Sequence, residues 1–176
     1  MKLAGTRTLV RLVLALVAVA VAVLAVSGCS MLKDASKSDT AKSKVGDCIN
    51  VIEGSATDSK TAPVACTDEK AVYKVAAVYD KKTDCKEEQT SYEETLNGGT
   101  TAFLCLSPNF KEGACYNESK STGYKFVACT APEASFKVLK RIDGQADEFA
   151  CDANTAIGFR IVPDPKTTFC LGNPKG

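Results

Sequence analysis

The sequence contains no histidine, so the side chain that serves most often as a general base and as a metal ligand is missing. Neither a Ser-His-Asp triad nor a Cys-His pair can be assembled without it. The chain also lacks a Gly-rich phosphate loop that follows a strand and opens a helix. We therefore expect no enzyme activity, no catalytic residue and no cofactor.

Clustered carboxylates are the remaining candidates for chemistry. One pair is Glu87 and Glu88, and a second group is Asp143, Asp147 and Glu148. The second group surrounds a glycine turn with oxygen ligands, but it lacks the alternating acidic spacing of an EF-hand calcium loop. We interpret both groups as solvated surface, the second as a turn that leads into a capped helix, and we predict no metal site.

Other absences narrow the choice of partners. None of the nine cysteines forms a Cys-x-x-Cys pair, and this spacing disfavours common zinc sites and a thioredoxin-like redox site. The charges nearly cancel, with 22 Lys and Arg against 21 Asp and Glu. Since no basic patch is present, we expect no nucleic-acid partner.

The N-terminus has the layout of a secretory signal. Three basic residues precede an uncharged apolar run at 12–26, which is too short to span a membrane comfortably. The following Ser-Gly-Cys resembles the lipobox of bacterial lipoproteins, and this resemblance implies cleavage after residue 28 and diacylation of Cys29. The alternatives are an ordinary signal peptide with a chance cysteine, or an uncleaved anchor.

These features predict a signal peptide at 1–28 and a lipid anchor at Cys29. The mature protein would be held on the extracytoplasmic face of a cell membrane, with the membrane itself as one partner. Residues 30–44 are rich in Ser and Lys and contain no aromatic residue, which is typical of a disordered tether. We therefore expect a lipidated, flexible region at 29–44.

Eight cysteines remain when Cys29 is set aside. An even number of cysteines in an exported protein is typical of a disulfide framework. We expect all eight to be bonded, and they are Cys48, Cys66, Cys85, Cys105, Cys115, Cys129, Cys151 and Cys170.

The cysteine motifs recur in the same order in two halves of the chain, which indicates an internal duplication. The copies are predicted at 45–110 and 111–176. Successive cysteines are 18, 19 and 20 residues apart in the first copy and 14, 22 and 19 apart in the second. The matching motifs are Gly-x-Cys-x-Asn at 46–50 and 113–117, Val-Ala-Cys-Thr at 64–67 and 127–130, and Cys-Leu at 105–106 and 170–171.

Each copy is predicted to be a small α+β unit of the order β-β-β-α-β. In the first copy, Asp84 and Glu87 form a capping box, and Cys85, Tyr92 and Leu96 share one face at helical spacing. Asp147 would cap a shorter helix at 148–154 in the second copy. The predicted strands are 45–52, 62–66, 71–79 and 103–106 in the first copy, and 112–118, 124–130, 134–142, 159–162 and 167–171 in the second.

Sequence alone leaves the disulfide connectivity open. If each copy closes its own bonds and both pair alike, three patterns remain. The favoured pattern links two neighbouring strands with the first bond of each copy, and pins the helix to the last strand with the second. Its pairs are Cys48–Cys66, Cys85–Cys105, Cys115–Cys129 and Cys151–Cys170.

Taken together, Gly-Asp-Cys, Val-x-Cys, a third cysteine and a closing Cys-Leu strand resemble the LppU-type lipoproteins of mycobacteria and other actinobacteria. The pattern is also similar to a domain of actinobacterial septum-formation proteins. In that domain a Pro-His often follows the second cysteine, whereas this chain has Thr67-Asp68 and Thr130-Ala131-Pro132. Any role of that histidine is therefore absent here.

The sequence favours a non-enzymatic envelope lipoprotein that acts as an extracytoplasmic binding or structural module in envelope growth or division. Its partner would be an envelope protein or a wall component. The alternatives are a thiol-redox or metal-handling lipoprotein, or a carrier of an apolar ligand in a cleft between the copies. Tyr73, Tyr79, Tyr116 and Tyr124 are candidate contacts, but we favour cross-strand packing for them, so no binding residue is named. A groove between the copies would lie near their junction at 108–113.

Mild reduction is expected to unfold the body. Each bond closes a loop that contributes about 3 kcal/mol through the entropy of the unfolded chain, and a copy of about 65 residues is marginal without it. Circular dichroism with and without reductant measures the effect. Non-reducing peptide mapping that found bonds between the copies would refute the favoured pairing.

Overall fold

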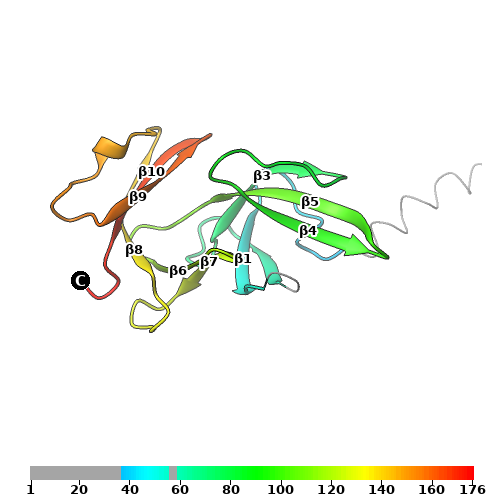
Figure 1. Ribbon diagram of the computed structural model, residues 1–176, viewed down its shortest axis with the longest axis horizontal. Helices are drawn as coiled ribbons and strands as arrows, with labels where there is room; N and C mark the ends of the chain where they lie inside the picture. Colours follow the sequence, from blue (N-terminus) through cyan, green and yellow to red (C-terminus); the bar gives the residue numbers. More distant parts are fainter. Residues whose placement is uncertain (1–36, 56–58) are drawn as a thin grey trace, which may run out of the picture. The chain divides into compact units, whose positions relative to one another are not determined.

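The computed structural model describes residues 37–55 and 59–176 (Figure 1). The predicted signal peptide at 1–28, the predicted lipidation site Cys29 and residues 30–36 of the predicted tether lie outside the described residues. In the part of the chain that is described, no helix is both long and apolar enough to cross a membrane.

The described chain forms two five-stranded antiparallel sheets. The first sheet has the strand order β2-β1-β3-β5-β4, and the second has β7-β6-β8-β10-β9. The strands of the first sheet are β1 (Cys48–Glu53), β2 (Lys60–Val64), β3 (Tyr73–Tyr79), β4 (Thr90–Leu96) and β5 (Gly99–Pro108). Those of the second are β6 (Cys115–Ser119), β7 (Gly123–Val127), β8 (Phe136–Asp143), β9 (Gly158–Pro163) and β10 (Lys166–Gly172).

The second sheet repeats the strand order of the first when its strands are counted from β6. The repetition extends to irregularities in the strand pairing. One bulge interrupts the β3–β5 pairing between Val75 and Ala77, beside Cys105. The other interrupts the β8–β10 pairing at the corresponding place, beside Cys170. The two sheets therefore share strand order and local geometry, as the repeated cysteine motifs do.

The predicted α+β class, with its β-β-β-α-β copies, is wrong. The segment predicted as a helix from Asp84 contains strand β4, whose residues alternate between half-buried and exposed. The physical reason is the turn at Asn97-Gly98, where φ is 51° and 78°. Positive φ at both central residues makes the two-residue turn that joins antiparallel strands, so this segment pairs with β5 as a hairpin.

The second predicted helix, at 148–154, is a single three-residue 3₁₀ turn, η1 (Glu148–Ala150). Its predicted cap is present, because an Asp147 carboxylate oxygen accepts a hydrogen bond from the Phe149 backbone N–H at 2.9 Å. The turn buries no residue, so no apolar face is available to extend it. The described chain is therefore nearly all β.

The prediction of a disordered tether is wrong for its last residues. Thr40 and Ala41 are only 2% and 4% exposed. The Ser38 backbone N–H donates to Glu94 of β4 at 3.0 Å, and Thr61 of β2 donates to the Thr40 hydroxyl at 2.8 Å. Because β4 and β2 are opposite edges of the first sheet, this segment packs across that sheet. The segment is therefore held by hydrogen bonds to both edges of the sheet and by burial of Ala41.

Both sheets contribute to one hydrophobic core. Phe110, in the link between β5 and β6, is fully buried. Its ring centroid lies 4.6 Å from that of Tyr116, 4.8 Å from Tyr124, 5.0 Å from Phe169 and 5.4 Å from Phe136. The same cluster includes residues of the first sheet such as Leu104. Ser38–Gly176 is one compact unit, and it contains this whole core.

A close contact joins the sheets at the β6–β7 turn. The Tyr124 backbone N–H donates to the buried Tyr73 hydroxyl at 2.6 Å. Gly123 has a φ of +72°, and a Cβ at that position would clash with the Tyr73 hydroxyl oxygen. Only glycine accommodates both the backbone conformation and the approach of the tyrosine.

Replacement of Phe110 by alanine is expected to destabilise the whole body by about 3–5 kcal/mol, because it leaves a cavity where both sheets meet. Chemical denaturation followed by circular dichroism measures the loss, and one transition is expected. The control is Phe149→Ala, since the Phe149 side chain is 85% exposed and its loss should cost less than about 0.5 kcal/mol. Equal effects of the two substitutions would contradict the shared core.

Candidate ligand groove between the two sheets

Four disulfides close the body, and their pairs agree with the pattern favoured from sequence. They are Cys48–Cys66, Cys85–Cys105, Cys115–Cys129 and Cys151–Cys170. Each bond joins one buried cysteine on a strand to one half-buried cysteine in a loop. The reason given for the second bond of each copy was wrong, since it pins a loop rather than a helix to the last strand.

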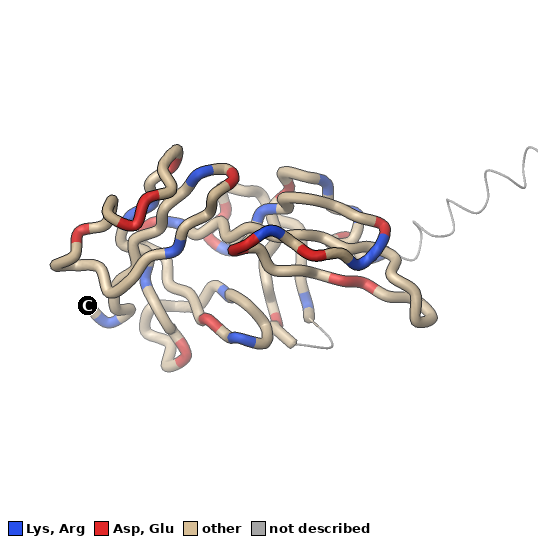
Figure 2. Tube along the Cα trace, turned by 45° about the horizontal axis from the view of Figure 1, so that its top comes forward, with Lys and Arg blue, Asp and Glu red and all other residues tan. Residues whose placement is uncertain are grey.

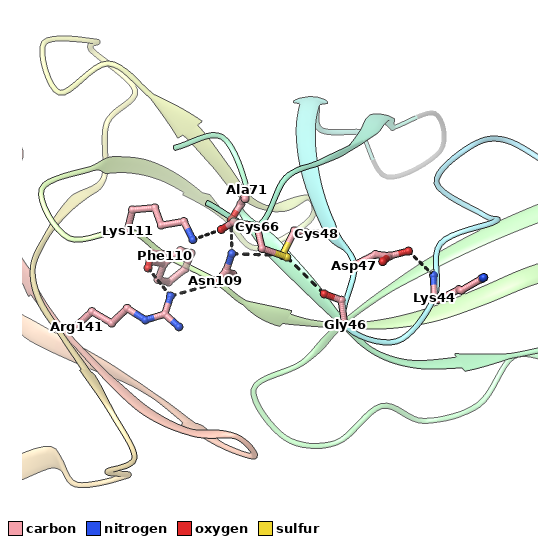
Figure 3. The surroundings of a disulfide bond; sticks show 10 residues. All are labelled: Lys44, Gly46, Asp47, Cys48, Cys66, Ala71, Asn109, Phe110, Lys111 and Arg141. Carbon is pink, nitrogen blue, oxygen red and sulfur yellow. Dashed lines mark hydrogen bonds between the residues drawn. A yellow bond between two sulfur atoms is a disulfide. The ribbon is translucent and has the colours of Figure 1, made fainter. Parts of the chain in front are cut away.

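The link between the sheets begins with a buried asparagine. Asn109 is 6% exposed, and its side-chain N–H donates to the Ala71 carbonyl oxygen at 3.0 Å. Its backbone N–H donates to the Val72 carbonyl oxygen at 2.8 Å. From the second sheet, Arg141 Nη1 donates to the Asn109 amide oxygen at 3.0 Å (Figure 3). Asn109 thus ties the two sheets together with satisfied polar groups.

The residue after Phe110 places a cation at the same junction. The Lys111 ammonium donates to the Cys66 carbonyl oxygen, beside the first disulfide (Figure 3). The Lys111 backbone N–H donates to the buried Tyr116 hydroxyl at 2.8 Å. The backbone and the side chain of Lys111 therefore both have hydrogen-bond partners, and the side chain is half-buried.

These residues line a groove of about 420 Å³ between the sheets. Lys74, Lys111 and Arg141 bring three positive charges to it, and its lining includes no carboxylate. The other polar lining residues carry hydroxyl or amide groups. The complete lining is Cys66, Thr67, Lys74, Ser107, Pro108, Asn109, Lys111, Arg141, Val162, Pro165 and Thr167.

The charge in the groove is only partly neutralised. Burial lowers the pKa of the Lys111 ammonium, and the charges of Arg141 and Lys74 lower it further, while Asp143 and Asp68 oppose the shift. Asp143 pairs with Arg141 Nε at 2.9 Å, but this carboxylate is 67% exposed. Within residues 37–55 and 59–176, neither lysine of the groove takes part in an ion pair.

A second pocket of about 430 Å³ adjoins the groove and shares Lys74, Ser107 and Pro165 with it. Val45, Val75, Ala76, Ala77 and Tyr79 provide apolar wall. The β9–β10 turn, at Asp164-Pro165, lines this pocket from the second sheet. An ion pair of 3.2 Å between Lys86 and Asp164 fastens the turn to the first half of the chain.

The carboxylates considered from sequence have different local roles. Asp143 pairs with Arg141 at the rim of the groove, and Asp147 caps η1. Glu87 and Glu88 line a different surface pocket. Among the residues that the structure describes, no group of three or more His, Cys, Asp or Glu side chains could hold a metal ion.

The packing interpretation is confirmed for three of the four tyrosines. Tyr73 and Tyr116 are buried in the core, and burial raises the pKa of Tyr116 to about 12. Tyr124 is half-buried and packs against the same core. Tyr79 is 44% exposed and lines the second pocket, so it is the one that contributes to a candidate binding surface.

Sequence analysis missed the three cations of the groove. Lys74, Lys111 and Arg141 are far apart in the chain, and positive and negative residues are interspersed along the described trace (Figure 2). The available signal was Lys111, which lies within the 108–113 junction where a groove was sought. Only the fold brings the other two cations to it.

No family model matches this chain, and no curated protein or solved structure matches it. The resemblance to LppU-type lipoproteins, drawn from cysteine and glycine positions, therefore stays a prediction.

Arg141→Met is expected to cost about 1–3 kcal/mol of unfolding free energy, because it leaves the buried Asn109 and Phe110 oxygens without a donor. Arg141 Nη1 now donates to the Phe110 carbonyl oxygen at 3.1 Å. Urea denaturation measures the change, and Lys166→Met, at an exposed position, is the control. A midpoint as high as that of the control would show that Arg141 does not hold the junction.

Proposed function

We propose that this chain is a non-enzymatic, lipid-anchored binding module on the extracytoplasmic face of a cell membrane. In this proposal the groove between the two sheets binds either an envelope protein or a wall component during envelope growth or division. The observation that carries the proposal is the convergence of Lys74, Lys111 and Arg141 on one groove of a body closed by disulfides.

The disulfides support the proposed compartment. All eight cysteines of the described chain are bonded, and such bonds persist in oxidising surroundings outside the cytoplasm. With their sulfurs engaged, these cysteines also have no thiolate to offer a metal or a redox partner. This favours a structural role for them over thiol-redox or metal handling.

The groove has the chemistry of recognition. Lysine, arginine, hydroxyl and amide groups are hydrogen-bond donors, and the two cationic types pair readily with carboxylate and phosphate oxygens. Because the Arg141 guanidinium is held by Asn109, Phe110 and Asp143, its position is fixed before a ligand arrives. Preorganised donors of this kind reduce the entropic cost of binding.

The short link to the proposed anchor limits where a partner can lie. Ser38, the first residue of the compact unit, comes nine positions after Cys29. A fully extended link of this length spans at most about 32 Å. A module anchored through Cys29 would therefore meet its partner near the membrane surface.

The anchor is tested by mass spectrometry of the mature N-terminus. The protein purified from its own envelope is expected to begin at Cys29 and to carry a diacylglycerol, while Cys29→Ala carries no lipid. A wild-type N-terminal peptide that begins before Cys29, or that lacks lipid, would contradict the lipoprotein assignment.

Binding is tested by capture from detergent-solubilised envelopes, with the full lipidated chain as bait. Lys74→Glu is expected to lose the captured component. Lys137→Glu is the matched control. Lys137 of β8 pairs with Cys115 of β6, just as Lys74 of β3 pairs with Cys48 of β1, but Lys137 does not line the groove. Equal capture by the two variants, or no capture by the wild type, would count against the groove as the binding site.

A further inference from the structure

The two pockets form one binding surface with two different ends. They share Lys74, Ser107 and Pro165. Lys74 of β3 and Ser107 of β5 are directly opposite in the strand pairing, so their side chains lie on the same face of the first sheet. A ligand seated on this shared floor can extend into both pockets.

The groove end suits an anionic group. Three cations line it without a carboxylate in the lining. Gln89 donates to the Ser107 hydroxyl oxygen at 3.3 Å, which leaves the Ser107 proton for a ligand oxygen. Carboxylate and phosphate groups both offer the acceptor oxygens that such a set of donors recognises.

The other end suits an apolar group. Its lining includes a run of apolar residues on β3 together with Val45 and the ring of Tyr79, although charged residues also line it. Val45 is 64% exposed, so an apolar ligand segment would remove exposed hydrophobic surface from water at this end.

The balance of charge differs between the two ends. Asp84 and Asp164 line the apolar pocket and not the groove, and Lys86, which also lines the apolar pocket, pairs with Asp164. The groove has cations and no carboxylate in its lining, so an anionic group is favoured beside Lys111. Each pocket is of the size usual for small-molecule sites.

We infer that this surface binds an amphiphilic anion, whose carboxylate or phosphate head lies among Lys74, Lys111 and Arg141 and whose apolar segment lies against Val45 and Tyr79. This inference rests on the proposed binding function of the groove. An amphiphilic anion is the ligand class that fits both ends, because an inorganic anion would leave the apolar wall exposed and a neutral amphiphile would offer Lys74 and Lys111 no anionic partner.

The test is isothermal titration calorimetry on the oxidised Ser38–Gly176 body, which contains both sheets, the core and all four disulfides. The probes are octyl phosphate, octanoate, inorganic phosphate and octyl glucoside, each below its micelle-forming concentration. Octyl phosphate, octanoate or both are expected to bind with a stoichiometry of one. Inorganic phosphate and octyl glucoside are expected to bind at least tenfold more weakly. The stronger of octyl phosphate and octanoate identifies the head group.

Variants locate the two ends. Lys74→Glu and Lys111→Glu are expected to weaken binding of the preferred probe at least tenfold, whereas Lys137→Glu leaves it unchanged. Val45→Glu, at an exposed position, should weaken binding by a similar factor. Its control is Ile52→Glu, which is also exposed and lies outside both pockets. Because Lys74 is exposed, its variant tests the site even if Lys111→Glu does not fold.

Three results would overturn the inference. If inorganic phosphate bound as tightly as octyl phosphate, the apolar end would not contribute to binding. If octyl glucoside bound as tightly as either amphiphilic anion, the cationic end would not contribute. If neither amphiphilic anion bound, the inferred ligand class would be wrong. In that last case the capture experiment with Lys74→Glu still decides the proposed function separately.

Discussion

The packing of Phe110 is the interaction on which the rest of the structure depends. Its ring contacts four aromatic rings of the second half within a core to which the first sheet also contributes. The residues on either side make the site, since Asn109 binds Ala71 and Arg141, and Lys111 binds Cys66. Three consecutive residues of the link between β5 and β6 therefore join the sheets and hold Lys111 and Arg141 at the junction, so the groove depends on the packing of the two halves.

The groove arises from divergence between two copies of one architecture. Strand order, the bulge beside the last cysteine and the disulfide pattern are the same in both halves. The cations do not follow this symmetry. Arg141 pairs with Phe169 on β10, at the position where Val78 pairs with Leu104 in the first sheet. A guanidinium in place of an apolar side chain makes one face of the junction suitable for an anion.

The sequence predicted the features that depend on local pattern or on covalent chemistry. The repeated cysteine motifs reduced the possible disulfide patterns to three, of which the favoured one is observed, and alternating apolar residues indicated most strands. The helix at Asp84 was wrong because a capping box was preferred to the Asn97-Gly98 turn, a hairpin signal thirteen residues further on. Residues 38–44 were judged by composition, which does not reveal hydrogen bonds to Glu94 and Thr61. The groove could not be predicted, because tertiary packing alone brings Lys74, Lys111 and Arg141 together.

Amide chemical-shift mapping on the oxidised Ser38–Gly176 body, titrated with octyl phosphate, tests most directly the central claim that the two sheets form one site. We expect the perturbed amides to cluster around Lys74 and Ser107 on the first sheet, around Lys111 in the link and around Arg141 on the second, and all to change with a single affinity. Perturbations confined to one sheet, or scattered over the surface with different affinities, would contradict it.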